Sequence, residues 1–390
     1  MMHSSHGRGL PRRAAPLLLL ALLTAPASAP LRAPPRSPPR AAAVAEQHLL
    51  YVASPGTRNY VEYGGVGILV FDIDRGYKFV RRIPTWTTPE GKPAENVKGI
   101  AASAATGRVF VTSRTNVIAI DAVSGATIWD RAYDGGTDRL AISPDGKTLY
   151  VPQFEGPLWH VVDAANGEVI GTIETKSGSH NTIYSAVGER VYLAGLKSAV
   201  LTVVDAKSRT AIGAVGPFGN VVRPFTVNGS NSLVFANVND LLGFEVGDVR
   251  SGKVLHRVEV TGYSKGTVKR HGCPSHGVAL TPDEKELWLA DCANGAIHIF
   301  DASTLPASPP KQIASLTMRD CVGWVSFSMD GRVAYSSTGE MIDVATRKVV
   351  ATLTDELGRA VQSEKMLDLV IAGGKVVRAG NQFGVGTRRN

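Results

Sequence analysis

The sequence predicts an all-β protein, a seven-bladed β-propeller with a blade closed by N- and C-terminal strands. Three observations support this fold class. A strand that ends in aspartate and is followed by a turn recurs about every 42 residues, and a hairpin signature precedes most of these aspartates. No stretch of helical periodicity interrupts the pattern. Four short strands in a repeat of this length are typical of a propeller blade and not of a helical solenoid.

The recurring aspartates mark the same point in each repeat. They are Asp72, Asp121, Asp163, Asp205, Asp248, Asp301 and Asp343. Ahead of most of them, an apolar run leads through an Asp-Gly-type turn into a second β-rich run, as in AISPDGKTLYVPQ at 141–153. We interpret the aspartates as turn residues whose carboxylates cap local backbone N–H groups. They therefore belong to the fold and not to the chemistry.

Counting the hairpins gives seven blades. They begin near Gly99, Arg139, Asn181, Pro224, Gly277, Trp324 and Asp368. The seventh lacks its outer strands, and Ile68–Phe71 and Tyr77–Ile83 at the other end of the chain can supply them, which would remove the open edges of an unclosed ring. His48–Ala53 is then either a surplus strand or a second strand that displaces Lys375–Ala379. The sequence leaves both alternatives open.

The repeats also resemble a known family. The segments RVFVTS, TLYVPQ, RVYLAG and LLYVAS resemble the YVTN-type repeats of bacterial surface proteins, of lactonase-like propellers and of the heavy subunit of quinoprotein amine dehydrogenases. The likeness covers about residues 46–386 and implies a WD40-like seven-bladed propeller. It implies no single activity, because one fold hosts unrelated functions.

The first residues predict export. Arg8, Arg12 and Arg13 precede the apolar run PLLLLALL, and the small-residue segment TAPASA follows it. This order is typical of a secretory signal peptide, which we assign to residues 1–29, followed by a Pro-rich linker at 30–45 and the propeller at 46–390. The apolar run is too short to span a bilayer, so we expect no transmembrane segment and a periplasmic or extracellular location.

Charge argues against nucleic acid as a partner. The formal net charge is +8, but residues 1–45 contain six arginines and no acidic residue. The rest of the chain holds 36 basic and 34 acidic residues and is therefore almost neutral. A basic footprint for phosphate backbones is not supported.

The functional signal lies just before the first strand of each blade. The loop into that strand, and the loop between the second and third strands, lie on the same face of a propeller. Stacking the repeats gives mostly charged or hydrogen-bonding residues at this position: Lys98, Asp138, Arg139, His180, Asn181, Arg223, Ser275, His276, Trp324, Glu364 and Lys365. The second loop row adds further polar residues, Arg114 among them.

Loop length points to the same face. Thr85–Val97 and Thr261–Pro274 are long, and long loops on a rigid scaffold are common binding elements. The opposite face carries tight turns such as SPDGK and SMDGR, and we expect nothing comparable there.

Binding and catalysis are both consistent with this ring. In the first interpretation it binds a small anionic ligand that carries a carboxylate, through Lys98, Arg114, Asp138, Arg139, Asn181, Trp324 and Lys365, with Arg223 as a further cation. In the second the protein is a lyase or an enzyme of lactonase or lactonizing type. His180 or His276 would then be the acid or base, with Arg223 as charge stabiliser and Glu364 as partner. An idle, solvated channel mouth and a scaffold or subunit that binds a partner protein on the long-loop face are further alternatives.

No cofactor is identified, although a divalent metal is one possibility. His271 and His276 have no standard ligand spacing, and no metal ligands are assigned. His180, His276 and Glu364 could gather as in the metal-dependent streptogramin lyases, which the chain resembles there only in residue class. His271 is otherwise a plain loop histidine, and His160 and His298 are expected to pack within strands.

The three cysteines are Cys273, Cys292 and Cys321. All lie near one face, so any pair could meet. We favour a Cys292–Cys321 disulfide, because the loop to Cys321 returns across the blade that Cys292 terminates. Cys273 is then free, and a single disulfide suits an exported chain.

Overall fold

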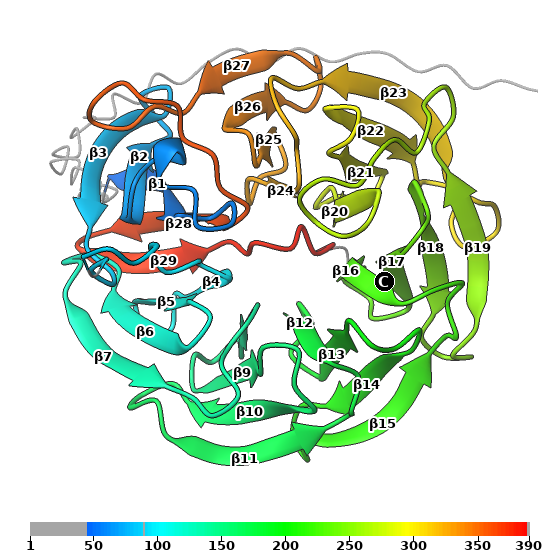
Figure 1. Cartoon of the computed structure of the whole chain (residues 1–390), viewed down its shortest axis with the longest axis horizontal. Coiled ribbons are helices and arrows are strands. Elements are labelled where there is room, and N and C mark those ends of the chain that lie inside the picture. The colour runs from blue at the N-terminus through cyan, green and yellow to red at the C-terminus, as the bar shows by residue number, and fades with distance from the viewer. Residues whose placement is uncertain (1–44, 89, 388–390) are drawn as a thin grey trace, which may run out of the picture. The chain divides into compact units, whose positions relative to one another are not determined.

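A computed structural model describes residues 45–88 and 90–387, so the predicted signal peptide and most of the linker lie outside the described residues. The described strands form seven antiparallel sheets around a central channel, and in six of these sheets the first strand of the blade is innermost (Figure 1). The predicted seven-bladed propeller is therefore confirmed. Each first strand begins within two residues of its predicted position.

Six sheets contain four strands each, ordered from the channel outward. Blades 1 to 3 consist of β4 (Gly99–Ser103), β5 (Arg108–Thr112), β6 (Asn116–Asp121) and β7 (Thr127–Ala132); β8 (Ala141–Ile142), β9 (Thr148–Pro152), β10 (Leu158–Asp163) and β11 (Val169–Glu174); and β12 (Ser179–Tyr184), β13 (Arg190–Gly195), β14 (Leu201–Asp205) and β15 (Thr210–Val215). Blades 4 to 6 consist of β16 (Val222–Val227), β17 (Leu233–Val238), β18 (Gly243–Asp248) and β19 (Val254–Glu259); β20 (Ser275–Leu280), β21 (Glu286–Asp291), β22 (Ala296–Asp301) and β23 (Lys311–Thr317); and β24 (Val325–Phe327), β25 (Val333–Ser336), β26 (Glu340–Asp343) and β27 (Val349–Thr352).

Blade 7 is built from both ends of the chain. It contains β29 (Lys375–Ala379), β28 (Met366–Ala372), β1 (Glu46–Ser54), β2 (Gly67–Asp72) and β3 (Lys78–Ile83), in that order across the sheet. The short 3-10 helix η1 (Val61–Tyr63) lies between β1 and β2.

This order resolves the alternative that the sequence left open. β1 pairs with β28 on one side and with β2 on the other, so His48–Ala53 is the second strand of the blade. Lys375–Ala379 becomes a fifth strand at the inner edge. The reason is local: Gly373 and Gly374 both have positive φ and form a tight hairpin that returns β29 onto the free inner edge of β28.

The turn aspartates act within the fold, as expected. Asp121 Oδ1 accepts hydrogen bonds from the backbone N–H groups of Val123 and Ser124, at 3.1 and 2.7 Å. Hydrophobic clusters fill the spaces between neighbouring blades. Phe71 of blade 7, for example, shares a cluster with Tyr335 and Met341 of blade 6. These contacts make a rigid ring on which loop residues can be positioned.

The C-terminal segment, residues 380–387, crosses the channel from blade 7 toward blades 4 and 5 (Figure 1). Gln382 Oε1 accepts a bond from Ile100 N in blade 1 at 3.1 Å. On the far side, the Gly384 carbonyl accepts from Leu280 N at 2.9 Å, and Gly386 N donates to the Val227 carbonyl at 3.0 Å. The segment therefore separates the two mouths of the channel, which the sequence did not predict. Among the described residues, no helix has the length and apolar character needed to cross a bilayer.

Candidate functional site

A cavity of about 250 Å³ lies at the channel mouth that carries the predicted ring. Its lining is strongly cationic. Among the described residues, the basic side chains that line it are Arg58, Lys98, Arg139, Arg223, Arg270 and Lys365, joined by His180, His271 and His276. The acidic residues in the lining are Glu155 and Glu364. Cations thus clearly outnumber carboxylates.

Glu364 lies between two of these cations at the centre of the site. Its Oε2 accepts from Arg139 Nη2 at 2.7 Å and from Lys365 Nζ at 2.8 Å. Burial by itself would raise the pKa of Glu364, but Lys365 and other neighbours outweigh it and hold the pKa well below its usual value. Burial also lowers the pKa of Lys365 to about 7, although Glu364 favours the charged form. One carboxylate therefore serves two cations.

A second carboxylate supports the site from behind. The Nδ1 of His180 lies 2.6 Å from Asp138 Oδ2, so it carries the proton and donates, and Nε2 accepts from Arg139 Nη1 at 3.2 Å. Lys98 Nζ lies 3.8 Å from the other Asp138 oxygen. Burial lowers the pKa of His180 to about 4, despite the opposing effect of Asp138. His180 is therefore a neutral imidazole at physiological pH.

Two further histidines form a stacked pair beside Glu364. The rings of His271 and His276 are 4.3 Å apart, and His271 Nδ1 lies 3.2 Å from Glu364 Oε1. His276 Nδ1 donates to the Gly323 carbonyl at 2.9 Å. Burial lowers the pKa of His271 to about 4 and that of His276 well below its ordinary value. A side chain at position 323 would collide with the His271 ring, so this glycine permits the close approach.

His271 is therefore more than the plain loop histidine expected from the sequence. With His276 and Glu364 it offers three ligand atoms within 4.8 Å of one another. Arg139 and Lys365 already bind that carboxylate, so a divalent cation there would face two positive charges. The set is a poor metal site on electrostatic grounds. The alternative of a group containing His180 fails geometrically, because the Arg139 guanidinium bridges His180 and Glu364.

The structure brings most of the predicted ring together. His180, His276, Arg223, Glu364, Lys98, Arg139 and Lys365 all line the cavity. Asp138 is fully buried behind His180.

Besides Asp138, three of the residues predicted to bind the ligand do not line it: Arg114, Asn181 and Trp324. Trp324 is buried beneath Arg139, whose guanidinium lies 4.5 Å from the ring centre, and its Nε1 donates to the Gln382 carbonyl at 2.6 Å. Arg114 covers the Phe154 ring at 4.6 Å. Asn181 is buried in β12, where it bridges to Arg139 through the backbone. Trp324 is therefore a support for Arg139 in this arrangement and does not present a stacking surface to the cavity.

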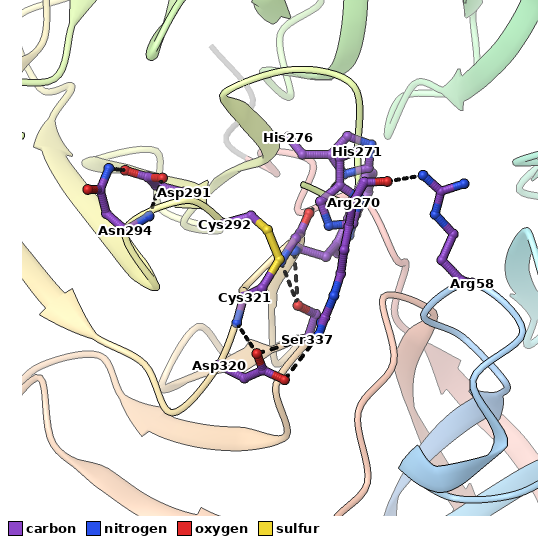
Figure 2. The surroundings of a disulfide bond; sticks show 12 residues. Arg58, Arg270, His271, His276, Asp291, Cys292, Asn294, Asp320, Cys321 and Ser337 are labelled. Carbon is purple, nitrogen blue, oxygen red and sulfur yellow. Dashed lines mark hydrogen bonds and ion pairs between the residues drawn. A yellow bond between two sulfur atoms is a disulfide. The ribbon is translucent and has the colours of Figure 1, made fainter. Parts of the chain in front are cut away.

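Two cations of the site come from loops outside the stacked position. Arg58 follows β1 and donates to the Arg270 carbonyl, and the Arg270 guanidinium lies 5.8 Å from the rings of both Tyr60 and Tyr63 (Figure 2 shows Arg58 and Arg270). Arg270 also pairs with Asp320 at 3.3 Å. The length of the loop at 261–274 was the sequence signal for Arg270, and no signal pointed to Arg58.

A disulfide joins Cys292 at the end of β21 to Cys321 in the loop that enters blade 6, which is the pairing favoured from the sequence (Figure 2). It lies beside His271. Cys273 is free and buried, with its Sγ 3.8 Å from the His271 carbonyl oxygen. The crosslink thus ties together two loops at the rim of the site.

Comparison with known proteins shows the fold alone. No protein-family model matches the chain, and no curated protein matches it significantly. It is similar to a chain of the mitotic checkpoint complex crystal structure, with 14% identity and a TM-score of 0.59, covering 74% of this chain and 83% of that one. It is similar to the dihydro-heme d1 dehydrogenase NirN in complex with DHE, with 15% identity and a TM-score of 0.58, covering 85% and 73%. The Cps50 (Swd1) β-propeller domain of Myceliophteria thermophila matches at 12% identity and a TM-score of 0.54, covering 76% and 93%. The chain is thus a seven-bladed propeller similar in structure to WD40 and NirN-like propellers.

Proposed function

We propose that this protein binds a small molecule bearing a carboxylate at the cationic channel mouth. The observation that carries the proposal is the excess of basic side chains around a cavity of about 250 Å³. Glu364, the buried acid among its lining residues, is already bound by Arg139 and Lys365. An anion would therefore find donors that the protein does not neutralise, in a space that suits a small ligand.

Two cations have donors to spare. Arg223 donates through Nη2 to the His271 carbonyl, while its Nε is buried without a partner among the described residues. Lys98 Nζ is beyond hydrogen-bond range of Asp138, at 3.8 Å. The guanidinium fork of arginine matches a carboxylate in a bidentate manner, and a charge-assisted bond contributes about 1.5–3 kcal/mol. Arg223 is the cation on which we expect affinity to depend most.

Titration calorimetry with oxalate, pyruvate and benzoate tests the proposal. Replacing Arg223→Ala should weaken binding about tenfold or more, at about 1.4 kcal/mol per decade. Asp330→Ala is the matched control, because Asp330 lies in a blade turn between β24 and β25, where it bonds Ser328 and Arg332. If none of the three anions binds the unmodified protein, or if Arg223→Ala and His276→Ala both leave affinity unchanged, the channel-mouth site is wrong.

Acid–base catalysis of lyase or lactonase type is the second candidate. It is favoured by the stacked His271–His276 pair, since burial lowers the pKa of both imidazoles and leaves them unprotonated at neutral pH, which is the form that a general base requires. His276→Ala separates the two candidates. If His276 carries a proton in the reaction, the substitution abolishes turnover but leaves ligand binding intact. If His276 only contacts the ligand, the substitution lowers affinity modestly.

We also propose that the protein is exported and belongs among the YVTN-type propellers. The charged, apolar and small-residue order of residues 1–29 supports export, and the Cys292–Cys321 disulfide supports it weakly. Sequencing the N-terminus of protein from the natural source tests this. A cytosolic protein that retains Met1 or Met2 would contradict it.

A further inference from the structure

The opposite mouth of the channel holds a second cavity, of about 320 Å³, where the sequence led us to expect nothing comparable. It lies between the C-terminal segment and the first strands of blades 1, 2 and 3. Its apolar lining includes Ile100, Leu140, Ile142, Ile183, Phe383 and Val385. The hollow arises because residues 384–387 bond to blades 4 and 5, which leaves the side toward blades 1 to 3 uncovered.

The chemistry of this cavity is the reverse of that at the cationic mouth. No Asp, Glu, Lys, Arg or His contributes to its lining in the described part of the chain. Most of its polar side chains are satisfied within the protein: Tyr184 donates to the Gly188 carbonyl at 3.3 Å, and Ser143 to Asp145 at 2.5 Å. A charged ligand would lose its hydration there without compensation.

Two buried polar atoms of the lining lack a partner among the described residues. They are Ser103 Oγ and Gln382 Nε2, in residues that are 4% and 1% exposed. The orientation of the Gln382 amide is determined, because its Oε1 must be the acceptor for Ile100 N at 3.1 Å. Nε2 is therefore a donor that still needs an acceptor, and a buried donor left unsatisfied costs about 1–3 kcal/mol.

We propose that this cavity binds an uncharged small molecule with an apolar body and a carbonyl or ether oxygen that accepts from Gln382 Nε2. The apolar lining buries the apolar body of the ligand, and the hydrogen bond from the Gln382 amide fixes the ligand's orientation. The site is independent of the anion site, since the two cavities share no lining residue and the C-terminal segment contributes only to the lining of this one. The rings of Trp324 and Phe383, 6.0 Å apart, form part of the partition.

Two neutral fluorescent probes test the proposal on the full chain. One is 6-propionyl-2-(dimethylamino)naphthalene, which has a ketone, and the other is N-phenyl-1-naphthylamine, which has none. The ketone probe should bind saturably with a blue-shifted emission. Gln382→Leu should weaken binding of the ketone probe roughly three- to tenfold, which is the equivalent of one hydrogen bond. The affinity for the other probe should be nearly unchanged.

A blocking variant locates the binding. Ala186 lines the cavity and is exposed at its rim, so Ala186→Trp should abolish binding of both probes without disturbing the core. Ala211→Trp on the exposed outer strand β15 is the matched control and should leave both unchanged, as should Arg223→Ala at the other mouth. The proposal is overturned if the ketone probe does not saturate, if Ala186→Trp retains it, or if Gln382→Leu weakens both probes equally. None of these outcomes bears on the anion site.

Discussion

Lys365 should make the stability of this protein rise with pH above neutrality. Its amine is buried with Glu364 and Arg139, and burial lowers its pKa from 10.5 to about 7 in the folded protein. In the unfolded chain it is exposed and protonated up to about pH 10. Between these values the unfolded state binds one more proton than the folded state, so the free energy of unfolding increases with pH. Lys365→Met removes this contribution.

The size of the effect follows from the two pKa values. The slope approaches about 1.4 kcal/mol per pH unit where the folded lysine is neutral and the unfolded lysine is charged. Close to pH 7 the folded lysine is only half deprotonated, so the slope there is about half as steep. Integrated from pH 7 to pH 9, Lys365 contributes about 2 kcal/mol. Below pH 7 both states hold the proton and the contribution is flat.

Urea unfolding at pH 7, 8 and 9 measures this difference. Other titratable groups, such as Cys273, whose burial raises the pKa of its thiol, are present in both proteins, so their contributions largely cancel in the comparison. We expect the unmodified protein to gain about 2 kcal/mol relative to Lys365→Met across this interval. Parallel pH profiles would show that Lys365 remains charged in the folded state and would refute the reasoning.

Four further predictions concern the elements that support the site. Cys292→Ser opens a disulfide of sequence separation 29 and should lower the free energy of unfolding by about 3–4 kcal/mol on the chain-entropy estimate; urea unfolding with and without dithiothreitol checks this, and an unchanged midpoint would contradict it. Truncation after Gly380 removes the acceptor of the Trp324 indole and should red-shift the tryptophan emission, whereas an unshifted spectrum would mean that the ring stays buried. Asp138→Asn should cost about 1–3 kcal/mol of unfolding free energy, because a charge-assisted bond is lost. His180 should remain neutral at pH 6 in the unmodified protein, which NMR titration measures; an imidazole that titrates near pH 6.5 would contradict its burial.

The sequence repeat predicted the propeller because each blade must bury apolar side chains in the same pattern. It did not predict on which side of β28 each of two strands pairs, since HLLYVA and KVVRA are equally compatible with a strand; the Gly373–Gly374 hairpin returns KVVRA to the inner edge. The C-terminal segment has no repeat signature, so its path across the channel had no signal in the sequence.

Stacking the repeats gave the height of each ring residue along the channel but not the direction of its side chain. Lys98 and Arg139 reach the cavity, whereas Trp324 turns beneath Arg139 to bond the C-terminal segment. Arg58 and Arg270 lie in irregular loops, where no repeat position predicts a contact. Periodicity therefore located the site and most of its charge, while the loop-borne cations depended on tertiary contacts.

The pairing of β1 with β28 has a consequence for how the chain folds during its synthesis. The Ser363 hydroxyl donates to the Ala53 carbonyl across 310 positions of sequence, and β1 finds its inner neighbour only at that distance. A ribosome that delivers the N-terminus first leaves the inner edge of β1 bare while six blades are made after it. Loop closure over such a span costs little more than over a short one, because the entropy grows only with the logarithm of length. The delay is the hazard, since an unpaired strand edge recruits other chains. Nascent molecules of this protein should therefore depend on a holding chaperone until β28 has emerged.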